Sequence, residues 1–350
     1  MKKYLALSFV LFLVVFLSGC SLGSSSKSQA PASPAKKPSS VLKSADGGRN
    51  WEAKNDAAGK VNLDAADVLS LSINPHDGRN IFIGTLKNGI LKTEDGGDNW
   101  KGAGLQVEKV YGIAFSYDDG RIVYASGVLN GRGKIFKSLD GGTVWNEIYT
   151  SPSDGPLVVS LVTDKKNPNM ILAGTSDKQL IKSSDAGTSW RSVYGADSPI
   201  MKIAIDSADS DVLYISTQKG EFQMSKDGGK NFVSTEDDKV RSVDIVVADP
   251  STGNVIYAAG KSGLFRSGDR GETWEELRTL GNAQSFPVKA LAINSANPRE
   301  IIYGAGQAVY KSVDEGVSWM PSQLVTARNI SAIAYDPGNP SIVYLGLRKK

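Results

Sequence analysis

The chain contains very few of the residues that carry nucleophilic or metal chemistry. Its 350 residues include one cysteine and one histidine. This excludes a disulfide within the chain and a Cys/His metal cluster. Catalysis by a Ser-His-Asp or Cys-His set is excluded as well, because His76 lies in a turn-type segment, Asn74-Pro-His-Asp-Gly78. No glycine-rich phosphate loop joins a strand pattern to a helix pattern. We therefore expect no metal and no cofactor.

The chain also lacks a strong excess of either charge. The formal net charge of +3 falls to +1 without Lys2 and Lys3, which precede the first apolar run. A near-neutral chain argues against a general nucleic-acid binder. We expect no nucleic-acid partner, so any basic surface must be argued from the positions of its residues.

No apolar run is long enough for a membrane-spanning helix, which needs about 20 residues. The run from Tyr4 to Leu17 follows two lysines and ends in Leu17-Ser-Gly-Cys20, which favours a secretory signal. The tetrapeptide resembles the lipobox of bacterial lipoproteins, in which the cysteine receives diacylglycerol and becomes the new N-terminus. We predict a signal peptide at residues 1–19, a lipid on Cys20, and an extracytoplasmic location on a cell-envelope membrane. The alternative is an ordinary signal peptide with an incidental cysteine.

Residues 20–40 predict a flexible linker after the lipidated cysteine. The stretch is rich in Ser, Ala, Pro and Lys and has no acid and no aromatic residue. Such a composition cannot bury enough apolar surface to fold. As a random coil of this length it would span roughly 25 Å.

The remainder repeats one eight-residue pattern seven times, S/T-x-D-x-G-x-x-W, known as the Asp-box. The starts are separated by 49, 45, 45, 42, 42 and 45 residues. The copies are Ser44–Trp51, Thr93–Trp100, Ser138–Trp145, Ser183–Trp190, Ser225–Phe232, Ser267–Trp274 and Ser312–Trp319. Their acids are Asp46, Asp95, Asp140, Asp185, Asp227, Asp269 and Asp314, and their aromatics are Trp51, Trp100, Trp145, Trp190, Phe232, Trp274 and Trp319.

The Asp-box residue types are those that a hairpin turn needs. The carboxylate and the hydroxyl accept backbone N–H groups, and glycine supplies a positive φ. The aromatic ring folds back and buries a large apolar face. All six tryptophans of the chain lie in these boxes, so we interpret them as structural and not as a sugar-binding platform.

Four short strand patterns per repeat predict an all-β fold, a seven-bladed β-propeller over residues 41–350. The repeated part begins with a third-and-fourth strand pair, from Val41 to about Lys54. It ends with a first-and-second pair, from Ile330 to about Leu347. We predict that the two pairs form one blade, which closes the ring and removes free sheet edges.

The Asp-boxes and turns such as Asp336-Pro-Gly-Asn-Pro340 support a family comparison over residues 41–350. The chain resembles sortilin/Vps10-type propellers, the photosystem II assembly/stability-factor group of lipoproteins and, more distantly, xyloglucanase-type family 74 glycoside hydrolases. It departs from all but the second group. Sortilins have more blades and a cysteine-rich module, and family 74 enzymes resemble two propellers with a cleft between them. The arginine cluster and Phe-Arg-Ile-Pro motif of sialidases are absent.

Carboxylate chemistry is the remaining catalytic alternative. A glycoside hydrolase needs two acids across a cleft, and the Asp-box acids are used by their turns. The alternative candidates lie near the starts of first strands or within one: Asp64, Asp67, Asp197, the run Glu236-Asp237-Asp238, and Asp244. The alternative interpretation is that most of these residues are ordinary solvated acids in loops. An inner-strand ion pair between Lys202 and Asp244 is a further expectation.

The binding interpretation rests on the loops between second and third strands, which we expect on the face opposite the Asp-boxes. Six of the seven loops place a basic residue there: Lys87, Arg132, Lys178, Lys219, Lys261 and Arg348, with Gln307 in the seventh. A second basic series precedes the boxes and reads as repeat consensus (Lys43, Lys92, Lys137, Lys182, Arg266, Lys311). The sequence favours a monomeric, non-catalytic scaffold that binds a protein or an anionic polymer. The alternative is a glycoside hydrolase or lyase.

Overall fold

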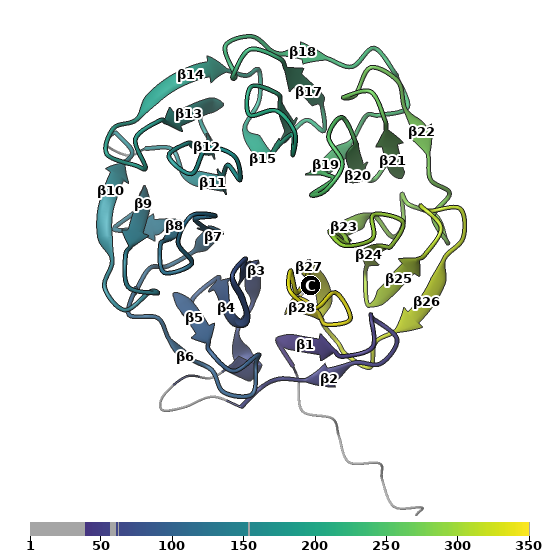
Figure 1. The fold of residues 1–350 in the computed structure, drawn as a ribbon, viewed down its shortest axis with the longest axis horizontal. Helices are drawn as coiled ribbons and strands as arrows, with labels where there is room; N and C mark the ends of the chain where they lie inside the picture. Colours follow the sequence, from purple (N-terminus) through teal and green to yellow (C-terminus); the bar gives the residue numbers. More distant parts are fainter. Residues whose placement is uncertain (1–38, 57–60, 62, 153–154, 350) are drawn as a thin grey trace, which may run out of the picture. The chain divides into compact units, whose positions relative to one another are not determined.

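The computed structural model describes residues 39–56, 61, 63–152 and 155–349. Seven four-stranded antiparallel sheets stand around a central axis like the blades of a propeller (Figure 1). This confirms the predicted all-β, seven-bladed fold. The predicted signal peptide, Cys20 and nearly all of the predicted linker lie outside the described residues. In the described part, no helix is long and apolar enough to cross a bilayer.

Each blade has four strands, which we call first to fourth in order from the axis outward. The first strands are β3 (Val68–Asn74), β7 (Val110–Phe115), β11 (Val158–Thr163), β15 (Ile200–Ile205), β19 (Val243–Ala248), β23 (Val288–Ile293) and β27 (Asn329–Tyr335). The second strands are β4 (Asp77–Thr85), β8 (Val123–Leu129), β12 (Ile171–Thr175), β16 (Leu213–Thr217), β20 (Ile256–Gly260), β24 (Ile301–Ala305) and β28 (Val343–Arg348).

The outer half of each blade carries the Asp-box between its two strands. The third strands are β5 (Ile90–Thr93), β9 (Arg132–Ser138), β13 (Gln179–Ser183), β17 (Phe222–Ser225), β21 (Leu264–Ser267), β25 (Ala308–Ser312) and β1 (Val41–Ser44). The fourth strands are β6 (Lys101–Gly102), β10 (Asn146–Thr150), β14 (Arg191–Gly195), β18 (Val233–Ser234), β22 (Glu275–Glu276), β26 (Met320–Gln323) and β2 (Glu52–Ala53). One 3₁₀ turn, η1 (Leu63–Ala65), precedes β3.

The hydrophobic core lies between neighbouring blades. Second strands such as β12, β16, β20 and β24 are buried along their whole length, so both of their faces pack against protein. Each core cluster joins two blades: one contains Tyr257 from β20 together with Leu291 and Tyr303 from the next blade. Because no blade has a core of its own, stability depends on the complete ring.

The two ends of the repeated region share one blade, as predicted. Its strand order is β2-β1-β28-β27 (Figure 1). The register of β1 against β28 runs from Val41 opposite Gly346 to Ser44 opposite Val343. The N–H of Leu347 also donates to the carbonyl oxygen of Ser40 (2.8 Å). Main-chain hydrogen bonds therefore close the ring. The edge of β1 that faces the axis is covered by β28.

Every first strand contains a register shift after its first or second residue. In β15 the paired residues are Ile200 and Lys202, with Met201 between them. In β19 and β23 the unpaired residues are Asp244 and Lys289. A bulge turns its extra residue away from the regular alternation of the strand, so it decides which side chains of the inner strands reach the axis.

The two ends of the propeller axis carry different loops. In each blade an Asp-box N–H donates to a carbonyl of the first-to-second-strand turn, as in Gly141 N to Arg121 O (2.9 Å) and Gly228 N to Asp211 O (2.9 Å). These loops together form what we call the Asp-box face. The second-to-third-strand loops and the connections between blades form the opposite face, which we call the loop face.

Candidate functional site: the axial channel and the loop face

The Asp-box acids are held by their own turns. In the box of β13–β14 the Ser183 hydroxyl donates to Asp185 (2.8 Å) and accepts the N–H of Gly187 (2.8 Å). Hydrogen bonds from the hydroxyl and N–H of Ser189, and from the Ser183 hydroxyl, lower the pKa of Asp185 to about 2. Hydrogen bonding to the charged form favours that form. The carboxylate is therefore ionised and occupied, which makes it a poor candidate for proton transfer.

The Asp-box aromatics pack within and between blades. Trp100 is fully buried, and the indole N–H of Trp145 donates to the Ala103 carbonyl of the preceding blade (2.7 Å). Trp274 meets Phe222 edge to face, with ring centroids 4.8 Å apart. These contacts agree with a structural role for the aromatic set.

The basic residues that precede the boxes join one blade to the next. Lys43, Lys92, Lys137 and Lys182 donate to the carbonyls of Gly96, Gly141, Ala186 and Gly228, which lie in the box of the following blade. The distances range from 2.7 to 3.3 Å. Arg266 approaches Glu315 of the next box (3.8 Å). The sequence predicts this series only as repeat consensus and misses these contacts, which connect residues 46 to 53 positions apart.

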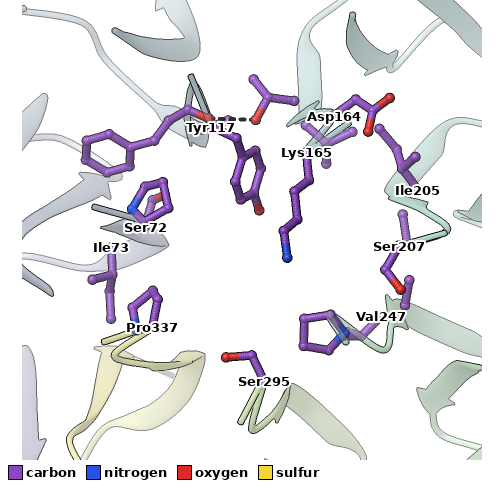
Figure 2. Close-up of a pocket in the computed structure, with 18 of the residues that line it drawn as sticks. Ser72, Ile73, Tyr117, Asp164, Lys165, Ile205, Ser207, Val247, Ser295 and Pro337 are labelled. Atoms are coloured by element: carbon purple, nitrogen blue, oxygen red, sulfur yellow. Dashed lines mark hydrogen bonds between the residues drawn. The ribbon is translucent and has the colours of Figure 1, made fainter. Parts of the chain in front are cut away.

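A wide cavity opens along the axis at the Asp-box face. It has a volume of about 830 Å³, and its walls are first-strand side chains such as Ile113, Leu161 and Ile203. Tyr117 and Lys165 extend from the turns into its mouth (Figure 2). Apolar walls with a few polar groups at the opening are typical of ligand pockets.

Carboxylates lie beneath the turns around this mouth. Asp164, Asp206, Asp249 and Asp336 are nearly completely buried, and each accepts the N–H of the second residue after it. Asp206 also accepts the hydroxyl of Tyr214 (3.1 Å). One oxygen of Asp164 is buried and has no hydrogen-bond partner among the described residues. These acids organise the turns, and their charge makes the mouth at the Asp-box face more negative.

A smaller cavity of about 240 Å³ lies further along the axis, towards the loop face. Lys202, Lys289, Tyr111, Ser160 and Ser331 are among its lining residues. The ion pair predicted between Lys202 and Asp244 is wrong. Asp244 binds Lys289 of the next blade (Oδ2 to Nζ, 2.5 Å), because both are bulge residues. Lys202 follows the bulge in its own strand and makes no ion pair within the described residues.

The alternative catalytic acids have different partners, although Asp64 and Asp67 both contact Arg328. Asp67 forms an ion pair with the buried Arg328 (2.9 Å), and it accepts the N–H of Lys349 (2.7 Å). Asp64 contributes its main-chain carbonyl to Arg328 (2.7 Å), and one of its carboxylate oxygens is buried without a partner. Asp197 is exposed on the connection from β14 to β15. Asp67 and Asp244 are thus committed to ion pairs, in different surroundings.

The acidic run Glu236-Asp237-Asp238 lies on the loop face in the connection from β18 to β19. Its last member pairs with Arg241, three residues along the chain. Both side chains of this pair are well exposed, so the interaction adds little to stability.

The predicted basic residues lie on the loop face, as the strand order requires. Lys87, Lys178, Lys219, Lys261 and Arg348 are exposed, and none of them forms an ion pair with the residues described. Arg132 differs: it is half-buried, and its guanidinium donates to the carbonyl of Ser151. Five free cations thus come from five blades.

An exposed apolar patch lies on the same face, where the basic series is interrupted at Gln307. It consists of Leu280 and Phe286, whose exposed fractions are 46% and 62%. The two side chains border a cavity of about 460 Å³ together with Gln307 and Asn329. Sequence reasoning missed this patch, although an isolated phenylalanine in the polar connection from β22 to β23 was a visible signal.

Sequence comparisons connect part of the chain with two groups. The model of the Sortilin-Vps10 family (sortilin, neurotensin receptor 3) matches residues 133–263. A xyloglucanase of Hypocrea jecorina is 30% identical over 204 residues, which cover 55% of this chain and 23% of the relative. A Paenibacillus xyloglucanase is 26% identical over 226 residues, covering 60% of this chain and 21% of the relative. The chain thus spans about a quarter of the length of these curated relatives.

Structural comparisons find the same propeller in two settings. The GH74 xyloglucanase of Xanthomonas campestris superposes with a TM-score of 0.69 at 17% identity, covering 81% of this chain and 51% of that chain. YCF48 of Cyanidioschyzon merolae gives 0.63 at 14% identity, covering 80% and 95%. A structure described as YCF48 bound to D1 peptide also gives 0.63, at 17% identity, covering 81% and 93%. At these identities the likeness establishes the fold. The chain is therefore an Asp-box seven-bladed β-propeller, similar in sequence to sortilin-type propellers and xyloglucanases and in fold to GH74 enzymes and YCF48.

Proposed function

We propose that this chain is a lipid-anchored, extracytoplasmic scaffold that binds a protein with an acidic surface on its loop face and catalyses no reaction. One observation carries the proposal: the loop face combines five exposed, unpaired cations with the exposed apolar patch of Leu280 and Phe286. Cations steer and orient a partner, and a central aromatic side chain can supply most of the affinity.

The arrangement of the cations matters more than their number. Each exposed ion pair contributes only about 0–1 kcal/mol. Charges spread around one face act together and attract an anionic partner at longer range. The acidic run Glu236-Asp237-Asp238 weakens this field on one side and so orients the partner. The patch favours a protein over a simple anionic polymer, because a polymer without apolar groups gains nothing from Phe286.

The comparisons support a single-propeller scaffold in one respect. The propeller covers nearly all of the YCF48 chains but only about half of the GH74 chains. One YCF48 structure is described as bound to a peptide, which is a precedent for protein recognition by a single propeller of this type.

The test compares two variants with equal changes in charge. The first replaces Lys87, Lys219 and Lys261 with Ser and Lys178 with Asn, because Lys178 has a positive φ of 75° that Asn tolerates. The second replaces Lys165, Lys166, Lys226 and Lys230, on the Asp-box face, with Ser. We expect the first variant to lose crosslinked capture of its envelope partner and the salt dependence of capture, and the second to retain both.

A third variant, Phe286→Ser, separates the two contributions on the loop face. We expect weaker capture with an unchanged salt dependence, because the apolar contact is lost while the field remains. Full capture by the first variant, with the salt dependence of the wild type, would place the contact elsewhere. If the wild type captures polysaccharide and no protein, the partner is an anionic polymer and the proposed protein partner is wrong.

Lipid anchoring is tested separately with Cys20→Ser. We expect this variant to move from the membrane to the soluble fraction and to keep its loop-face binding, because Cys20 lies outside the propeller. If it fractionates with the membrane as the wild type does, the anchor hypothesis fails.

A glycoside hydrolase is the second candidate, favoured by the sequence similarity to xyloglucanases. The hypothesis requires a pair of acids, and the candidates that form no ion pair with the described residues are Asp64, Asp197, Glu236 and Asp237. Incubation of the purified protein with xyloglucan and with envelope glycans tests it. Release of oligosaccharides by the wild type, and its loss in Asp197→Asn or Asp64→Asn, would establish this activity and overturn the scaffold proposal.

A further inference from the structure

The inner cavity of the channel differs from its surroundings in charge. Seven structurally equivalent positions follow the first-strand bulges. Six of them are small or apolar, and the seventh is a lysine: Ser70, Gly112, Ser160, Lys202, Ile245, Ala290 and Ala332. A long cationic side chain at one of these positions has no structural explanation in the repeat.

Lys202 has no acidic partner in the described part of the chain. The nearest bulge acid, Asp244, is taken by Lys289. Crowding by the channel walls lowers the pKa of Lys202, and the positive charge of Arg348 lowers it further. This end of the channel has an excess of two positive charges, because three cations (Lys202, Lys289 and Arg348) face one acid, Asp244. Lys202 is itself exposed to the water of the channel, so a dissolved anion can reach its ammonium group and supply the missing counter-charge.

The cavity also offers neutral hydrogen-bond donors. Tyr111 and Ser160 line it with Lys202 and Lys289, and their hydroxyls make no hydrogen bond to any residue the structure describes. The volume of about 240 Å³ is ample for one tetrahedral oxyanion with a few water molecules. Two ammonium groups and two hydroxyls around such a space match the donors that oxyanion sites use.

We propose that the inner cavity binds one small inorganic oxyanion, of the size of phosphate or sulfate, between Lys202 and Lys289. The anion supplies the counter-charge that Lys202 lacks, and the hydroxyls of Tyr111 and Ser160 orient it. The residues that would hold the anion belong to first strands and line the axis, so they are distinct from the loop-face lysines, although the charge of Arg348 acts on both. This site does not depend on the scaffold proposal.

The test measures phosphate binding to the purified protein by calorimetry, and thermal unfolding over a phosphate series at constant ionic strength. A ligand that binds only the folded state raises the Tm in proportion to the logarithm of its concentration above the Kd. We expect saturable binding of one phosphate or sulfate by the wild type and no comparable effect of chloride.

Four variants locate the site. Lys202→Met should abolish binding, yet unfold at the same or a higher Tm than the wild type in phosphate-free buffer, because it removes an unpaired cation. Lys202→Arg should retain binding, because the positive charge is kept. Asp244→Asn should tighten it several-fold by releasing Lys289. Lys230→Met, the same charge change in the Asp-box of the same blade, should bind phosphate as the wild type does, because Lys230 is exposed on the opposite face. The absence of saturable binding in the wild type, or unchanged binding in Lys202→Met, would overturn the proposal.

Discussion

At the scale of single residues, several blade boundaries are each bridged by a lysine side chain. Lys92 is 5% exposed, and its ammonium group contacts the Gly141 carbonyl of the next blade (2.7 Å) and Glu94 of its own (2.9 Å). It also lies over the ring of Phe82. Removing a buried charged group that makes such contacts lowers the free energy of unfolding, whereas removing a solvent-exposed charge changes it little.

This contrast gives a matched pair of predictions. Lys92→Met should lower the free energy of unfolding by about 2 kcal/mol. Lys101→Met should change it by less than about 0.5 kcal/mol, although Lys101 binds the same Glu94 (2.7 Å) with both side chains half exposed. Urea denaturation of both variants is the measurement. Equal effects would mean that the contact between blades adds nothing to the ion pair.

The Asp-box acids set the response of the fold to acid. Their hydrogen bonds lower the pKa of Asp185 and of Asp314 to about 2, against about 3.9 for an unfolded aspartate. The folded state therefore releases these protons more readily. Its stabilisation is complete above about pH 4 and is lost as the pH falls towards 2.

We accordingly expect the urea midpoint to be flat from pH 7 to 5 and to fall steeply between pH 4 and 2. Asp185→Asn should be less stable at pH 6 and show a shallower fall, because one titrating group is missing. A midpoint that stays constant down to pH 2.5 would contradict the assignment of stability to these carboxylates.

At the scale of strands and loops, the shared blade decides whether the ring closes. Strands β27 and β28 cover the inner edge of β1, and Arg328, which precedes β27, binds Asp67 and the carbonyl of Ala66 at the start of the next blade. Arg328 is 4% exposed. It therefore secures the closure with a buried ion pair in addition to the main-chain bonds.

Arg328→Met should lower the free energy of unfolding by about 3 kcal/mol, because removal of one partner of a buried pair leaves the other uncompensated. Arg299→Met is the control, since Arg299 is largely exposed and only approaches Glu315 (3.7 Å). Removal of residues 329–350 should have a larger effect and give insoluble or protease-sensitive protein. A truncated form that melts as the wild type does would show that closure by β27 and β28 is dispensable.

The sequence predicted the blades and their closure because both depend on patterns that can be counted: seven boxes at near-constant spacing, and strand pairs left over at each end. It could not predict the inner channel. A bulge has no residue signature here, since its extra position is Leu, Tyr, Val, Met, Asp, Lys or Ser in the seven blades. Without it, Lys202 and Asp244 occupy equivalent positions, and the partner of Asp244 is assigned to the preceding blade, whereas it lies in the following one. The contact of Lys92 with Gly141 was invisible because it joins positions 49 residues apart.

At the scale of the whole molecule, we expect the pairing of β1 with β28 to slow the opening of the ring. A circular permutant cut between Ser153 and Asp154, with Lys349 joined to Ser39 by a short Gly/Ser linker, keeps every strand pairing. Its ring, however, is closed at the new break by side-chain contacts between two blades, with no sheet shared across it. We expect it to fold and to unfold roughly tenfold faster, which corresponds to about 1.4 kcal/mol in the barrier. Insertion of the same linker at 153–154 of the natural order is the control, and equal unfolding rates would contradict the prediction.

The hydrogen bond between Leu347 and Ser40 also fixes where the chain leaves the propeller. Because β1 runs from Val41 towards its Asp-box, Ser40 lies at the loop-face end of the blade, beside the start of β3, where its hydroxyl donates to Ala66. If Cys20 carries a lipid, as we propose, the 20-residue linker joins the propeller at this same loop-face end and, as a random coil, spans roughly 25 Å. Such a tether keeps the proposed binding surface within reach of membrane-bound partners while leaving the tilt of the propeller free.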